Sequence, residues 1–162
     1  MAEHGSAAGK RRITKRPITA PDVLNEAYDY EKPSAFSRGT RVTLGDAAWL
    51  FISGTASVDE HGETVHVGDF KAQVKRMFRN VTRLLEVEGA DWHDVARTTI
   101  YLKEMERDYA AFNEVRCEFF QQQQLDPPPA STCVQAAICR PELLCEMEAI
   151  IILPADRPRP GA

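Results

Sequence analysis

The sequence predicts an α+β fold in which two helices lie on one face of a sheet of about five strands. Two segments carry apolar residues at helical spacing, and several segments rich in β-branched and aromatic residues lie between and around them. The chain has 162 residues, of which 43% are hydrophobic, and this suits one compact domain.

Five segments are predicted to be strands because they are rich in β-branched and aromatic residues or alternate in polarity: residues 41–44, 48–53, 98–102, 131–139 and 145–153. Gly45 and Asp46 lie between the first two and are typical of a hairpin turn. The turn sequence Arg140-Pro141-Glu142 is expected to end the fourth strand. Some neighbouring strands are therefore joined by short turns and others by helices.

Two helices are predicted between these strands. From Phe70 to residue 85, apolar residues recur three and four positions apart, with Asp69 as the expected N-cap and Gly89 as the expected stop. A second helical pattern begins after Asp108 and ends in the polar run 121–124, which a run of prolines follows. No third helix is predicted, so the other sheet face needs a different cover. Packing of subunits sheet to sheet is the economical solution, and we expect a homo-oligomer.

The two ends of the chain are predicted to be flexible tails around one domain, with boundaries at 1–20, 21–154 and 155–162. The N-terminal tail holds the basic cluster 10–16, whereas the net charge of the whole chain is −4. The remainder is therefore acidic, which does not favour binding along a phosphate backbone. A basic cluster at a chain end is more often a solvated tail than a nucleic-acid-binding arm.

The sequence also argues against several other classes of protein. Its longest apolar run, Ala149–Leu153, is far shorter than a membrane span, and no signal peptide is recognisable. The four cysteines contain no CxxC pair, so we expect reduced thiols in a cytoplasmic protein without a metal site. No generic catalytic motif is present. His61 and His66 flank a predicted turn, where exposed histidines are common.

Whole segments of the chain resemble the RidA/YjgF family in unbroken order over residues 33–153. The resemblance rests on Ile52–Asp59, Gln73 with its helix, Val95–Leu102, Asn113-Glu114-Val115, Pro129-Ala130, Cys133-Val134-Gln135 and Glu146–Ile150. It implies a chorismate-mutase-like subunit that assembles as a homotrimer with three clefts between subunits. It also implies an enamine/imine deaminase, which hydrolyses reactive imines to a 2-keto acid and ammonia without a metal or cofactor.

The same resemblance implies roles for individual residues. Glu146 falls on the glutamate that activates the attacking water, Phe36-Ser37 on an aromatic-serine pair, and Asn113 on a helix asparagine. An arginine that binds the substrate carboxylate is expected directly after Pro129-Ala130, but Ser131 stands there. Loss of a bidentate charged contact costs about 2–3 kcal/mol, so small 2-imino acids are expected to bind less well.

Two other arginines are candidates for the missing anchor. Arg38 follows Phe36-Ser37, and Arg140 follows Cys139. Their segments resemble the C-terminal half of chorismatases, which have a RidA-like fold and hydrolyse chorismate. A bulkier cyclic carboxylic acid is therefore an alternative ligand.

Further hypotheses concern side chains that share a strand face. Cys133 lies two residues from Ser131 and is expected to point the same way, but a reactive thiolate needs a positive neighbour. Glu146 and Glu148 likewise share a face. Two rivals to the deaminase remain: a non-catalytic metabolite-binding trimer, and an endoribonuclease, which the acidic charge disfavours.

Overall fold

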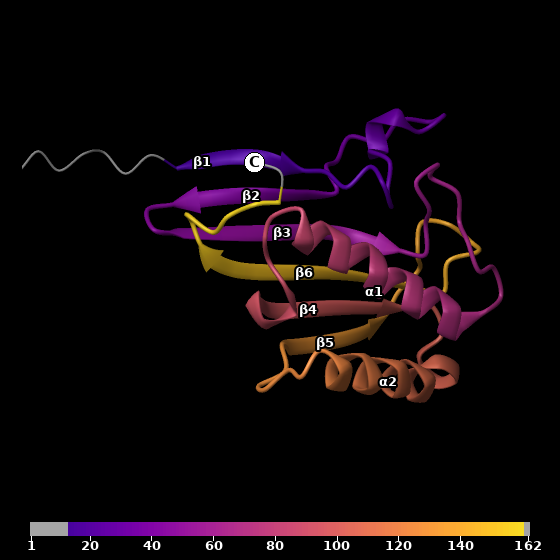
Figure 1. The fold of residues 1–162 in the computed structure, drawn as a ribbon. Helices are drawn as coiled ribbons and strands as arrows, with labels where there is room; N and C mark the ends of the chain where they lie inside the picture. Colours follow the sequence, from indigo (N-terminus) through magenta and orange to yellow (C-terminus); the bar gives the residue numbers. More distant parts are fainter. Residues whose placement is uncertain (1–12, 161–162) are drawn as a thin grey trace, which may run out of the picture.

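The structure, a computed structural model, describes residues 13–160 as a six-stranded sheet with two long helices on one face (Figure 1). The strand order is β1-β2-β3-β6-β4-β5, and only β4 and β5 run parallel. The strands are β1 (Thr14–Ile18), β2 (Gly39–Leu44), β3 (Ala47–Ala56), β4 (Val95–Leu102), β5 (Ala130–Gln135) and β6 (Cys145–Pro154). The predicted α+β class and the predicted hairpin between β2 and β3 are confirmed.

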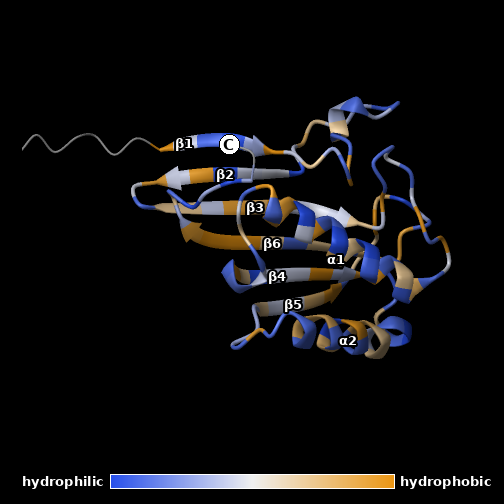
Figure 2. Ribbon diagram, in the orientation of Figure 1, coloured by the Kyte–Doolittle hydropathy of each residue, from blue (hydrophilic) through white to orange (hydrophobic). Residues whose placement is uncertain are grey.

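Strand β6 lies between β3 and β4, and every second side chain of this strand packs into the core. Cys145, Met147 and Ala149 are at most 3% exposed, as are Ile151 and Leu153, and these five alternate with more exposed residues. Figure 2 shows the second half of β6 as the most continuously apolar part of the sheet. Because successive side chains of a strand point to opposite faces, the residues between them point away from the helices.

The helices α1 (Phe70–Glu86) and α2 (Met105–Gln122) cover that apolar face. The predicted N-cap of α1 is confirmed, because the Asp69 side chain accepts a hydrogen bond from the backbone N–H of Ala72. Helix α2 begins at Met105, earlier than predicted. The Met105 N–H donates to the side chain of Gln135, a partner distant in sequence, so local capping signals do not mark this start. No helix within residues 13–160 is long and apolar enough to cross a membrane.

Several predicted boundaries differ from those in the structure. Residues 14–18 form the edge strand β1, although the N-terminal tail was expected to reach residue 20. This strand lacks an apolar alternation because it is a sheet edge, where charged residues and Pro17 are tolerated. At the other end, the Ala155 N–H donates to the Asp46 carbonyl, so the expected C-terminal tail begins with a residue held against the sheet. Strand β5 ends at Gln135 rather than at residue 139. The rest of the basic cluster, residues 10–12, lies outside the described residues.

A buried carboxylate joins β1, β2 and the end of α1. Glu88 is 3% exposed and accepts hydrogen bonds from Arg16 of β1 and from Arg41 of β2. The Arg41 guanidinium is also buried and donates to the Ala155 carbonyl at 2.8 Å. Arg16, by contrast, keeps 38% of its side chain exposed. Glu88 is therefore the carboxylate that compensates the buried charge of Arg41.

We expect Glu88→Gln to lower the free energy of unfolding by about 3–5 kcal/mol, because it leaves the Arg41 charge buried without a carboxylate. Arg16→Ala removes only a half-exposed partner and is expected to cost about 1 kcal/mol or less. Urea denaturation of the two variants measures the difference. Equal losses of unfolding free energy in the two variants would contradict the conclusion that Glu88 compensates the buried charge of Arg41.

Candidate active site

A cavity of about 680 Å³ lies at the end of the sheet where β3 finishes and β6 begins. Its walls come from four segments: the loop before β2, the end of β3, the turn 58–63 and the segment that leads into β6. Four of the predicted site residues line it, namely Phe36, Arg38, Arg140 and Glu146. The cavity therefore unites the predicted water-activating glutamate with both arginines proposed as anchors.

The Glu146 carboxylate occupies space that a glycine leaves free. Glu146 pairs with Ala56 of β3 and Tyr101 of β4, and a β-carbon built on Gly54 would come within 2.8 Å of its carboxyl carbon. Burial raises the pKa of Glu146 above its usual range, and the nearby Glu148 charge raises it further. A carboxyl with a raised pKa in a cavity is typical of a general acid or base.

Replacement of Gly54 by Ala is expected to push the Glu146 carboxylate out of its place. The clash involves the end of a flexible side chain, so the fold should tolerate it. The displaced carboxylate should be better solvated, and its pKa should fall towards the ordinary value. NMR titration of the Glu146 carboxyl carbon measures this, with the melting temperature as the control for folding. An unchanged pKa of Glu146 would contradict the close packing of its carboxylate against Gly54.

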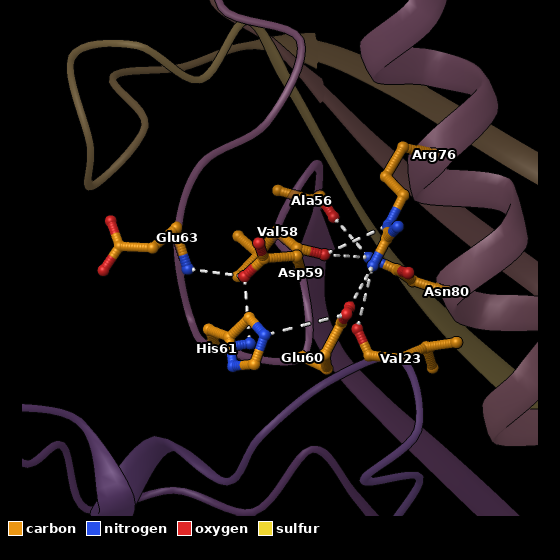
Figure 3. Close-up of polar contacts among 9 residues, drawn as sticks. All are labelled: Val23, Ala56, Val58, Asp59, Glu60, His61, Glu63, Arg76 and Asn80. Carbon is orange, nitrogen blue, oxygen red and sulfur yellow. Dashed lines mark hydrogen bonds and ion pairs between the residues drawn. The ribbon is translucent and has the colours of Figure 1, made fainter.

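One wall of the cavity is fixed to helix α1 by polar contacts (Figure 3). The buried Asn80 side chain donates to the carbonyls of Ala56 and Val58 at 3.0 and 2.8 Å. Arg76 also donates to the Val58 carbonyl, and the Asp59 side chain accepts from two backbone N–H groups of the turn that follows. Asn80 and Arg76 therefore hold the end of β3 and the turn 58–63 in place.

The segment before β6 is fixed to the same helix. The Gln73 side chain, fully buried, donates to the Glu142 carbonyl and accepts from the Leu144 N–H. Helix α1 thus positions two walls of the cavity through buried amide side chains. Of the two loop histidines, His61 lines the cavity and is exposed, whereas His66 is exposed outside it.

Arg38 and Arg140 both lie against the ring of Tyr30, each with its guanidinium carbon 5.2 Å from the ring centroid. Arg38 is 4% exposed and donates from Nε to the Asn25 carbonyl and from Nη2 to the Tyr30 hydroxyl. Arg140 donates from Nη1 to the Gly62 carbonyl at 2.6 Å. Both arginines therefore use donors to hold the loops of the cavity together. Tyr30 was not predicted, since an isolated tyrosine in a loop carries no motif.

The two residues of the predicted aromatic-serine pair, Phe36 and Ser37, make different contacts. Phe36 is 42% exposed, lines the cavity and lies 5.6 Å from the Arg38 guanidinium carbon. Ser37 accepts a hydrogen bond from the Ser53 hydroxyl through its backbone carbonyl. Phe36 thus faces the cavity, whereas the contact made by Ser37 fixes the backbone.

The remaining predicted residues lie elsewhere: Ser131 and Cys133 are in the edge strand β5, and Asn113 is in α2. Ser131 pairs with Thr98 and Cys133 with Ile100, and these β4 side chains are buried under the helices. Glu146 pairs with Tyr101, which points to the opposite face. Within one chain the structure therefore does not bring these three residues together with Glu146.

An arginine that was not predicted joins this second group. Arg116 of α2 donates from Nη1 to the Ser131 hydroxyl at 3.3 Å and from Nη2 to the Asn113 side chain. A signal for it exists in the sequence, because residues 113 and 116 share one face of a helix. The apolar periodicity of the helix does not distinguish this arginine from a solvated one.

The structure does not favour Cys133 as a nucleophile. Burial raises the pKa of its thiol, and the charge of Arg116 opposes this rise without overcoming it. Cys145 is buried, and its pKa is raised to about 12. Among residues 13–160, no group of His, Cys, Asp or Glu side chains is arranged to hold a metal ion.

Iodoacetamide at neutral pH should therefore alkylate the exposed Cys117 and Cys139 well before Cys133 and Cys145. The thiolate is the reactive form, and a raised pKa reduces its fraction. Peptide mapping by mass spectrometry over a time course measures the order. Preferential alkylation of Cys133 would restore the nucleophile hypothesis.

Comparison with known proteins agrees with this fold and with the predicted resemblance. The family model described as endoribonuclease L-PSP matches residues 31–153. The chain belongs to this family, also called RidA/YjgF. As a RidA/YjgF protein, it is 39% identical over 103 residues to a RutC family protein of Pyrococcus abyssi, covering 63% of this chain and 76% of that one.

Two further relatives carry functional information in their names. The chain is 32% identical over 101 residues to the 3-aminoacrylate deaminase RutC of Acinetobacter baylyi, covering 62% of this chain and 76% of RutC. The crystal structure of E. coli TdcF with bound serine superposes with a TM-score of 0.70 at 25% identity, covering 85% of this chain and 98% of TdcF. The RidA-like fold and family predicted from the sequence are thus confirmed.

Proposed function

We propose that this RidA-like protein hydrolyses an enamine or imine that carries a carboxylate, releasing a keto acid and ammonia with water positioned by Glu146. The observation that carries the proposal is the Glu146 carboxyl, whose pKa is raised, in a cavity of about 680 Å³. The name of the RutC relative, a 3-aminoacrylate deaminase, supports this class of substrate.

The chemistry needs one group that both accepts and donates a proton. An enamine first tautomerises to the imine. Water then adds to the carbon of the C=N bond while the Glu146 carboxylate takes one of its protons. The protonated carboxyl then passes this proton to the nitrogen. Glu146 takes the remaining hydroxyl proton and delivers it to the same nitrogen, so that the C–N bond of the tetrahedral intermediate breaks to give the carbonyl and ammonia. A carboxyl with a raised pKa suits both steps, because its two protonation states lie closer in energy near neutral pH.

The proposal includes a homotrimer with sites between subunits, as the family resemblance implies. Two observations support it. The sheet face opposite the helices carries exposed Trp49, Phe51 and Ile152, each about 40% exposed. In addition, the cavity with Glu146 and the group around Ser131 lie apart in one chain, so a second copy is needed to unite them.

The pH dependence of the reaction tests the role of Glu146. Because only the carboxylate accepts a proton, kcat/KM for 2-iminopropionate should rise with pH through a pKa above 4.5, the ordinary value for glutamate. Glu148→Gln removes a neighbouring negative charge, so the rise should move to lower pH. Ammonia release over a pH series measures both profiles.

Glu146→Gln supplies the control. It should reduce turnover by about a hundredfold or more, the usual worth of a general base. The free energy of unfolding should not fall in this variant. A carboxyl whose pKa is raised by folding destabilises the folded state as the pH rises through that pKa, and glutamine does not ionise. Turnover that survives Glu146→Gln would overturn the mechanism.

A larger substrate is the second candidate, since the cavity volume exceeds what a three-carbon imino acid needs. Chorismate and benzoate represent the cyclic carboxylic acids of that class. Consumption of chorismate would favour this candidate, whereas a raised melting temperature without consumption of any imine or ring acid would favour a binding protein. An endoribonuclease has less support, because the chain has a net charge of −4 and the arginines of the cavity share it with exposed Asp29, Glu31 and Glu63.

A further inference from the structure

The guanidinium of Arg116 is held in a fixed orientation at the β5 edge. Its Nη1 donates to the Ser131 hydroxyl, its Nη2 donates to the Asn113 side chain, and its carbon lies 5.1 Å from the centroid of the Phe112 ring. The Ser131 hydroxyl in turn lies 3.1 Å from the hydroxyl of Thr98. A helix, a strand and an aromatic ring thus preorganise one planar cation.

The positive charge of Arg116 has no carboxylate partner in the part of the chain that the structure describes. Ion pairs within 4.0 Å join other arginines to acidic residues, including Arg83 with Asp22 and Arg107 with Asp108, but none involves Arg116. A guanidinium presents five N–H donors in a fork that matches a carboxylate. Two donor contacts are made here, so donors remain for an anion.

Arg116 also places a cation beside position 131, where the family resemblance predicts an arginine and the chain has serine. Because Ser131 is small and exposed, its side chain leaves the guanidinium approachable from the strand edge. The two other candidate anchors differ in this respect. Arg38 is nearly buried with two nitrogens engaged, and Arg140 is bound to a loop carbonyl.

We propose that Arg116 is the carboxylate anchor of this protein, supplied by α2 in place of a side chain at position 131. The guanidinium binds the carboxylate of the ligand, and the Ser131 hydroxyl and the Asn113 side chain orient the guanidinium. This inference rests on the proposed function to the extent that the substrate carries a carboxylate. It replaces Arg38 and Arg140, which instead shape the cavity that contains Glu146.

The test is carboxylate binding by the full-length protein, measured by isothermal titration calorimetry with pyruvate and with benzoate as probes. Arg116→Gln should weaken binding of the probe by about tenfold or more, as expected for loss of a charged hydrogen-bonding partner. The double variant Arg116→Gln/Ser131→Arg returns a guanidinium to the same place from β5. It should recover most of the lost affinity, a result that a merely structural role of Arg116 would not produce.

Two matched variants complete the experiment. Arg79→Gln removes an exposed arginine of α1 and should leave binding unchanged, which controls for net charge. Arg140→Gln tests the rival anchor. If Arg140→Gln abolishes binding while Arg116→Gln does not, or if the wild-type protein binds neither probe, the inference is overturned. Melting temperatures of all variants establish that they are folded.

Turnover of 2-iminopropionate separates this inference from the proposed function. If the protein binds a probe through Arg116 but releases no ammonia from the imine, the anchor stands and the proposed hydrolysis fails. If ammonia is released but Arg116→Gln leaves KM and probe affinity unchanged, the hydrolysis stands and the anchor is wrong.

Discussion

The alternation of side chains along β6 is the constraint on which the rest of the molecule depends. Every second residue from Cys145 to Leu153 packs under the helices, so Glu146 and Glu148 must point to the other face. A shift of one residue would bury both carboxylates in the core and expose five apolar side chains. The burial that stabilises the domain therefore also fixes the direction of the proposed catalytic group.

Most of the fold was predictable because it depends on local patterns. The spacing of apolar residues in α1, the N-cap Asp69 and the β2–β3 turn carry their signals within a few residues. Strand β1 carries none, since its stability comes from pairing with β2 and from the contact between Arg16 and Glu88, 72 positions away. The start of α2 was not predictable for the same reason, because the Met105 N–H bonds to Gln135, 30 positions away.

The candidate site was predictable only where one residue carries the signal. Glu146, Phe36, Arg38 and Arg140 were expected near one ligand, and all four line one cavity. The sequence did not reveal that Gly54 makes room for Glu146, or that Tyr30 lies against two guanidinium groups. The sequence did not point to Arg116, because it lies on α2, whereas the resemblance places the arginine at position 131.

The walls of the cavity are held by contacts of unequal strength. The turn 58–63 and the segment before β6 are bound to α1 through the buried amides of Asn80 and Gln73. The loop around Tyr30 is held instead by arginine contacts and by local backbone bonds from Asp29, Ser34 and Phe36. Amide hydrogens of the helix-bound walls should exchange with solvent more slowly than those of residues 28–36. The buried amides of α1 thus fix two walls of the cavity independently of the arginines that hold the Tyr30 loop.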